Sequence, residues 1–90
     1  MIIKGLNFIN TCKRWPEQYD VKDENGNQVA YVRLRFGILY CKVPGIGGKE
    51  IYTKYFDNDM IGFFVKDEER EFFLNEIADK ILEGIEEENQ

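Results

Sequence analysis

The side chains that most often carry out covalent catalysis are scarce in this chain. It contains no histidine and no serine, so the usual general base and the usual hydroxyl nucleophile are both missing. Cys12 and Cys41 could act as nucleophiles only without a histidine partner, and their spacing is not that of a metal site. Carboxylates are plentiful, but a glycosidase-type pair needs an apolar cleft to raise one pKa, for which 90 residues leave little room. We therefore expect no enzymatic activity and no cofactor.

Two local patterns have the composition of ligand-binding loops. Asp57, Asp59, Gly62 and Glu68 have the spacing of positions 1, 3, 6 and 12 of a calcium-binding EF-hand loop. Two other positions that usually supply oxygen carry aliphatic side chains, and the segment before Asp57 has the pattern of a strand. A turn followed by a capped helix is therefore favoured over a cation site. The glycine-rich run 45–49 lacks the spacing and the following helix of a phosphate-binding P-loop, and it predicts a hairpin connection.

A third pattern combines aromatic rings with cations. Bases of single-stranded nucleic acid stack on aromatic rings while phosphates pair with Arg or Lys, so such a surface suits nucleic acid. Tyr and Arg are also enriched in protein interfaces, and cross-strand pairs of these residues stabilise exposed sheets without any binding role. These three alternatives stay open. The candidate binding residues, which the strand register below places on one outward sheet face, are Tyr31, Arg33, Arg35, Tyr40, Lys42, Tyr52 and Lys54.

The stretch 28–56 is the centre of the predicted sheet. Apolar side chains alternate with polar or amphipathic ones, which is the period of a half-buried strand. A reversal at Phe36-Gly37 makes every inward residue meet an apolar partner, and a slip by one residue would turn the whole apolar set toward water. Because Phe-Gly is not a preferred two-residue loop, we expect a looser turn or a bulged bend there. The inward pairs are Leu34 with Leu39, Val32 with Cys41, and Ala30 with Val43.

Two further strands flank this pair. The dipeptide Asn25-Gly26 predicts a two-residue hairpin turn, which sets Val21 opposite Ala30 and Tyr19 opposite Val32. The last strand, 50–56, follows the glycine-rich loop. Pairing Val43 with Ile51 and Cys41 with Thr53 places Tyr55 inward and leaves Tyr52, Lys54 and Phe56 outside.

A helix follows the sheet. Asp67 is a suitable N-cap, and acidic residues in the first turn favour the helix dipole. The acidic run 86–88 opposes the dipole at the other end, so we expect the last turn to fray. Segment 1–14 predicts a short strand that, with Trp15, could either extend the sheet or cover its outward face. The apolar stripe that covers the sheet consists of Phe73, Leu74, Ile77, Ala78, Ile81, Leu82 and Ile85.

These elements predict an α+β fold with a single domain over residues 1–90. It is a four-stranded antiparallel β-meander packed against a carboxyl-terminal α-helix, with the amino-terminal segment as a candidate extra strand. Its charge is uneven, because residues 28–56 carry +4, residues 57–90 carry −9 and residues 1–27 are neutral. This asymmetry could orient a charged partner, or could serve solubility alone. A signal-peptide pattern and a membrane-length apolar run are both missing, so we expect a cytoplasmic protein with free thiols and no membrane contact.

Several runs resemble small uncharacterised proteins of phages and mobile elements of Gram-positive bacteria. They are residues 8–13 (FINTCK), 15–21 (WPEQYDV) and 31–37 (YVRLRFG), together with Pro44 and Gly47-Gly48. The resemblance assigns no site residue. It implies a small acidic protein that acts by binding, in some cases by blocking a host defence or regulatory protein, with the acidic helix face as a mimic of nucleic-acid phosphate.

The sequence therefore predicts a non-enzymatic protein-binding module, an inhibitor of a host protein in its most specific form. The alternative is single-stranded nucleic-acid binding by the outward sheet face. Either function is compatible with a homo-oligomer.

Overall fold

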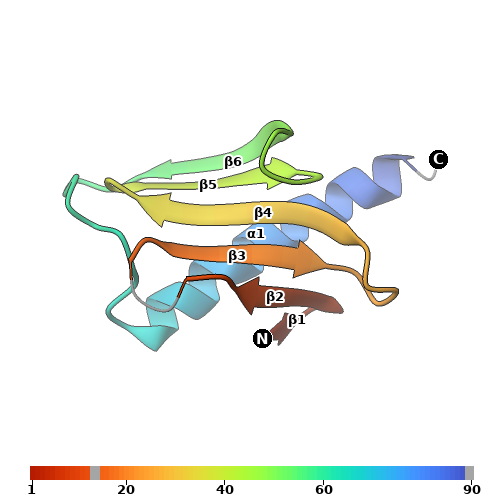
Figure 1. Cartoon of the computed structure of the whole chain (residues 1–90), viewed down its shortest axis with the longest axis horizontal. Helices are drawn as coiled ribbons and strands as arrows, with labels where there is room; N and C mark the ends of the chain where they lie inside the picture. The colour runs from red at the N-terminus through yellow and green to blue at the C-terminus, as the bar shows by residue number, and fades with distance from the viewer. Residues whose placement is uncertain (13–14, 89–90) are drawn as a thin grey trace.

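A computed structural model of the chain describes residues 1–12 and 15–88 (Figure 1). The described residues form two layers, an antiparallel sheet in front and a single helix behind it, measuring 40 × 23 × 21 Å. Lys13 and Arg14, which end the predicted amino-terminal strand segment and include the last residue of one resembling run, lie outside the described residues.

The sheet has six strands, and their order across the sheet is the same as their order along the chain. Two more strands are present than the four predicted, because the amino-terminal segment forms a hairpin of its own. This hairpin extends the sheet beside β3, so segment 1–12 does not fold over the outward face. The strands are β1 (Ile2–Ile3), β2 (Leu6–Asn10), β3 (Glu17–Lys22), β4 (Gln28–Arg35), β5 (Ile38–Val43) and β6 (Lys49–Tyr55).

The alternation of apolar residues gave the correct register for the central strands. Leu34 pairs with Leu39 and Val32 with Cys41, and the Val21–Ala30 and Tyr19–Val32 pairs of the preceding hairpin are also confirmed. All of these side chains point toward the helix and are buried. The core they form comprises Ile3, Leu6, Phe8, Tyr19, Val21, Ala30, Val32, Leu34, Leu39, Cys41, Phe64, Leu74, Ile77, Ala78 and Ile81.

The turns differ from the predictions. Phe36-Gly37 is a tight two-residue loop rather than a looser bend, with φ of 53° and 73° at its two residues. Lys4-Gly5 forms an equivalent loop between β1 and β2. A two-residue hairpin turn whose twist matches the strands requires positive φ at both central residues. Phe36 and Lys4 adopt this conformation although neither residue type is preferred there. The turn at Asn25-Gly26 is longer than predicted, because Asp23 bonds to Asn27 across it.

The predicted register of β6 was wrong. Cys41 pairs with Tyr52 rather than Thr53, and Val43 pairs with Lys49 rather than Ile51. The register shifts between Cys41 and Lys42, which leaves Ile51 as an extra residue in a β-bulge. Because of this extra residue, every side chain of β6 after the bulge lies on the face opposite to the predicted one. Tyr52, Lys54 and Phe56 therefore lie on the helix side of the sheet and Tyr55 lies on the outward side.

The helix α1 (Asp67–Glu88) has Asp67 as its first residue rather than as its N-cap, because the Lys66 carbonyl already accepts from the Arg70 N–H at 3.2 Å and the Asp67 carboxylate binds the Arg70 guanidinium. Its apolar stripe covers the sheet as expected. Two polar contacts tie it to opposite sides of the sheet. The Lys4 ammonium, beside β1, forms an ion pair with Asp79, and the Tyr52 hydroxyl of β6 donates to Glu76 at 2.8 Å. The fraying expected for the last turn stays a prediction. Within residues 1–12 and 15–88, no helix is both long enough and apolar enough to cross a membrane.

Candidate binding surface

The sheet face turned away from α1 is open to solvent, and we call it the outer face. Across the described part of the chain, no helix or strand lies over it. Its side chains form rows that cross the strands, because residues paired in antiparallel register share a face. The row beside the β4–β5 turn, here the turn row, contains Arg35, Ile38 and Tyr55. The middle row contains Gln18, Arg33, Tyr40 and Thr53, and the far row contains Asp20, Tyr31, Lys42 and Glu50.

Five of the seven predicted binding residues are brought together on this face: Tyr31, Arg33, Arg35, Tyr40 and Lys42. The other two, Tyr52 and Lys54, are displaced to the helix side by the bulge in β6. Tyr52 is occupied there, because its hydroxyl donates to Glu76, and burial together with that carboxylate raises its pKa above the usual range. These two residues are therefore removed from the candidate surface.

Cations lie over aromatic rings in the middle and turn rows. The Arg33 guanidinium carbon is 5.3 Å from the centroid of the Tyr40 ring, and the Lys42 ammonium is also 5.3 Å from it. The Arg35 guanidinium carbon is 4.7 Å from the centroid of Phe36. These distances are those of cation–π contacts, so the rings restrict where the two guanidinium groups point.

Tyr31 contributes little exposed surface although it lies on the outer face. It is only 5 % exposed, and its hydroxyl lies 3.1 Å from the Gln18 side-chain oxygen, to which it donates. The ring is therefore packed among its neighbours rather than presented to a ligand, and this burial raises the pKa of Tyr31. A base could not stack on this ring without rearranging the far row.

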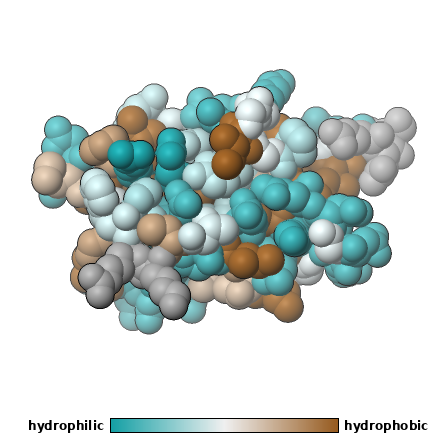
Figure 2. All heavy atoms as spheres, in the orientation of Figure 1, coloured by the Kyte–Doolittle hydropathy of each residue, from teal (hydrophilic) through white to brown (hydrophobic). Residues whose placement is uncertain are grey.

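The turn row continues into a group of exposed aromatic side chains at one end of the molecule. Trp15, Phe36 and Tyr55 are 45 %, 54 % and 71 % exposed, and the Trp15 and Phe36 rings meet edge to face with centroids 6.0 Å apart. With Ile38 we call this group the aromatic end. In Figure 2, which looks onto the outer face, hydrophobic side chains show at the left end, among hydrophilic ones. Sequence reasoning missed this group, because it placed Tyr55 inside and treated Phe36 as a hinge.

Residues 56–66, which we call the connector, join β6 to α1 and contact the aromatic end from the helix side of the sheet. The Gly37 N–H donates to the Ile61 carbonyl at 2.8 Å, and the Glu17 N–H donates to the Gly62 carbonyl at 2.7 Å. Trp15 lies directly on Gly62, where a Cβ atom would be 1.6 Å from the indole nitrogen. Any side chain at position 62 would therefore displace the Trp15 ring.

A buried carboxylate fixes this connector to the sheet. Glu17, at the start of β3, is 4 % exposed and accepts hydrogen bonds from the Tyr19 hydroxyl at 2.6 Å, the Phe64 N–H at 3.0 Å and Arg70 at 2.7 and 3.0 Å. Burial raises the pKa of the Glu17 carboxyl, but the bonds from Arg70, Tyr19 and Phe64 outweigh burial and hold it below its usual range. The carboxylate therefore stays ionised and joins the sheet, the connector and the first turn of α1.

The other chemical candidates of the sequence lie elsewhere. Asp57, Asp59 and Glu68 are exposed, and the described residues hold no group of three acidic, Cys or His side chains able to bind a metal ion. Cys12 and Cys41 are both free thiols. Burial raises the pKa of Cys41 to about 12, so its thiol is protonated at neutral pH and unsuited to nucleophilic attack.

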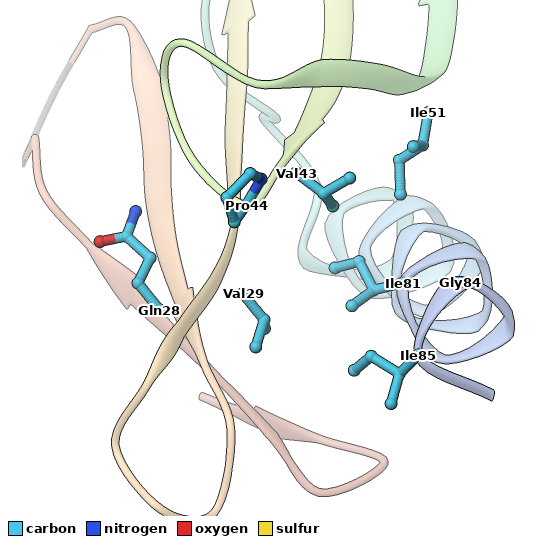
Figure 3. Close-up of a pocket in the computed structure, with 8 residues that line it drawn as sticks. All are labelled: Gln28, Val29, Val43, Pro44, Ile51, Ile81, Gly84 and Ile85. Atoms are coloured by element: carbon cyan, nitrogen blue, oxygen red, sulfur yellow. The ribbon is translucent and has the colours of Figure 1, made fainter. Parts of the chain in front are cut away.

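A hollow of about 400 Å³ opens between the sheet and the carboxyl-terminal half of α1 (Figure 3). Ile81 and Ile85 of the helix face Val43 across it, while the Gln28 amide points away from the helix. The Gln28 amide nitrogen donates to Asp20 at 3.1 Å on the outer face, which leaves aliphatic side chains as the main lining. The hollow is at the end of the sheet opposite the aromatic end.

Compared with known protein families, with curated proteins and with solved structures, the chain matches none.

Proposed function

We propose that this protein is a non-enzymatic binding module that recognises a protein partner through its outer face. The observation that carries the proposal is the aromatic end beside Arg35, where Trp15, Phe36 and Tyr55 are all exposed at one end of the sheet. Trp, Tyr and Arg are the residues that most often dominate the binding energy of protein interfaces. Strand pairing and the connector hold these side chains in place, so little ordering entropy opposes binding.

The far row favours a protein over single-stranded nucleic acid. Asp20 and Glu50 stand in that row on either side of Tyr31 and Lys42. A phosphate backbone crossing the face would meet these carboxylates, whereas nucleic-acid grooves that track phosphates are positively charged throughout. Tyr31 is also buried, which removes one of the rings on which bases would stack.

The partner that fits the phage-like resemblance is a host defence or regulatory protein, which the module would inhibit by occupying its surface. Affinity capture from a lysate of a Gram-positive bacterium tests this function. Tyr55→Ala removes the most exposed ring of the aromatic end, and Phe72→Ala removes an exposed ring from α1 as the matched control. A protein retained by the wild type and by Phe72→Ala, but lost with Tyr55→Ala, supports the proposal. Equal retention by the wild type and both variants would contradict it.

A titration of fluorescent single-stranded oligonucleotides at low and moderate salt tests the alternative. Binding that weakens steeply with salt and disappears in the Arg33→Ala/Arg35→Ala variant would make the outer face a nucleic-acid surface. Absence of binding at low salt would eliminate that alternative.

A further inference from the structure

Arg33 and Arg35 carry charge that the described part of the molecule does not neutralise. Their guanidinium groups lack a carboxylate partner at ion-pair distance within residues 1–12 and 15–88. The Nε atoms of both are buried, and neither has a hydrogen-bond partner among the described groups. Arg70 shows the contrast, because its guanidinium binds both Glu17 and Asp67. Both side chains are half-buried, so their unpaired charges have lost part of their hydration, and a carboxylate bound to the guanidinium groups would compensate for that loss.

The far row differs from the middle and turn rows in containing acidic side chains. Asp20 and Glu50 stand at its two ends with Tyr31 and Lys42 between them, and Lys42 is opposite Glu50 although these two are not at ion-pair distance. The middle and turn rows contain no acidic side chain. The acidic helix cannot compensate, because α1 packs on the other side of the sheet. An anionic ligand would therefore bind beside the aromatic end.

The spacing of the two arginines sets the shape of that ligand. Arg33 and Arg35 are two residues apart on β4, and a strand rises about 3.3 Å per residue, so they are about 6.6 Å apart. Carboxylates on alternate residues of an extended peptide have the same separation. The cation–π contacts with Tyr40 and Phe36 restrict both guanidinium groups, and a guanidinium is suited to binding a carboxylate through two parallel hydrogen bonds.

We propose that Arg33 and Arg35 bind two carboxylates on alternate residues of an extended acidic segment of the partner protein, whose next apolar side chain packs on Phe36 and Tyr55. The inference rests on the proposed function, since it specifies the partner for the same surface. The segment lies along β4, with its carboxylates over the middle and turn rows and its apolar residue over the aromatic end. Charge complementarity selects this occupant, because the far row already contains acidic side chains and the middle and turn rows contain none.

Fluorescence anisotropy with a labelled peptide tests the inference. The probe contains Glu-Thr-Glu-Thr-Phe, and a control peptide has glutamine at both glutamate positions. We expect the protein to bind the probe but not the glutamine peptide. The affinity for the probe should fall at least tenfold in Arg33→Gln and in Arg35→Gln, and should be unchanged in Lys80→Gln on α1. Arg33→Lys and Arg35→Lys keep the charge but cannot form the paired hydrogen bonds, so we expect them to lose several-fold in affinity as well. Circular dichroism of each variant confirms that the fold is kept.

Each of the following results would overturn the inference. Equal affinity for the probe and the glutamine peptide would show that carboxylates are not recognised. Stronger binding of oligothymidylate than of the probe would assign the arginines to phosphate. Concentration-dependent dimerisation in sedimentation, abolished by Arg33→Gln, would identify the occupant as the acidic helix of a second copy. If a captured protein depends on Tyr55 but not on either arginine, the proposed function stands and this inference fails; if no captured protein depends on Tyr55, the function itself fails.

Discussion

Removing the carboxylate of Glu17 should be the most destabilising single change outside the apolar core. Glu17→Ala deprives three groups of their acceptor at once, namely the Tyr19 hydroxyl, the Phe64 N–H and the Arg70 guanidinium. Each of these groups lies where the connector and the first turn of α1 meet the sheet. The variant should therefore loosen the support of the aromatic end as well as lower the free energy of unfolding.

The magnitude follows from the burial of the partners. Breaking a buried ion pair by removing one member costs about 3–5 kcal/mol, and each buried donor left without an acceptor costs about 1–3 kcal/mol. These contributions overlap, and the Arg70 side chain is 21 % exposed, so water can replace part of what it loses. We expect a loss of about 3 kcal/mol, which lowers the melting temperature of a domain of this size by roughly 12–24 °C.

Urea unfolding followed by circular dichroism measures this loss. Glu83→Ala is the control, because it breaks the Lys80–Glu83 pair between two exposed side chains and should cost no more than about 0.5 kcal/mol. A loss below about 1 kcal/mol for Glu17→Ala would refute the reasoning, since it would mean that water or the released Arg70 replaces the network at almost no cost.

The Glu17 carboxylate should also make the free energy of unfolding depend on pH. Its pKa in the folded protein lies below the ordinary value of 4.5, so its stabilisation is complete above pH 4.5 and is lost as the pH falls through the folded-state pKa. Glu17→Gln carries no titrating group at this position. The stability difference between the wild type and Glu17→Gln should therefore narrow below pH 4.5, and a constant difference down to pH 2 would contradict this.

Three further predictions concern other parts of the chain. Gly84→Ala should raise stability by about 0.5–1 kcal/mol in thermal melts, because Gly84 lies within α1 and an added Cβ would meet no atom within 4 Å. Cys12 should react with a thiol reagent at pH 8 in the folded protein, whereas Cys41 should react only after denaturation, because burial raises its pKa to about 12. Phe36→Val should destabilise the protein by about 1–3 kcal/mol and Phe36→Asn by less, since asparagine tolerates a φ of 53° and a β-branched residue does not; equal melting temperatures for the two variants would contradict this.

The parts of the fold that follow from alternation were predictable from the sequence. Apart from Glu17, the buried residues on the inner face of β3, β4 and β5 are apolar, and that alternation determines the pairing across three strands. The bulge at Ile51 has no such signal. Ile51 and Tyr52 are both partly buried against the core, and a period of two cannot represent an inserted residue. This single residue put Tyr52, Lys54 and Tyr55 on the wrong faces, whereas the two-residue error at Val43, which pairs with Lys49, lies before the bulge and reflects a shorter loop than predicted.

The candidate surface was predictable to the same extent. Arg33, Arg35 and Tyr40 were placed correctly because they are on strands whose register was correct. Tyr55 was misplaced with the rest of β6. The role of Glu17 was missed because a glutamate usually indicates an exposed position, and the only hint was that it shares its face with Tyr19 and Val21.

The agreement between strand order and chain order affects how the protein unfolds. Each strand of the meander pairs only with its neighbours in sequence, so the sheet by itself could lose its edge hairpin without disturbing the rest. Contacts between distant parts of the chain come mainly from α1, whose apolar stripe packs on the whole inner face. The helix therefore makes unfolding cooperative. In native-state hydrogen exchange, we expect the amides of β3, β4, β5 and the middle of α1 to exchange together through global unfolding, and those of β1 to exchange earlier through local opening.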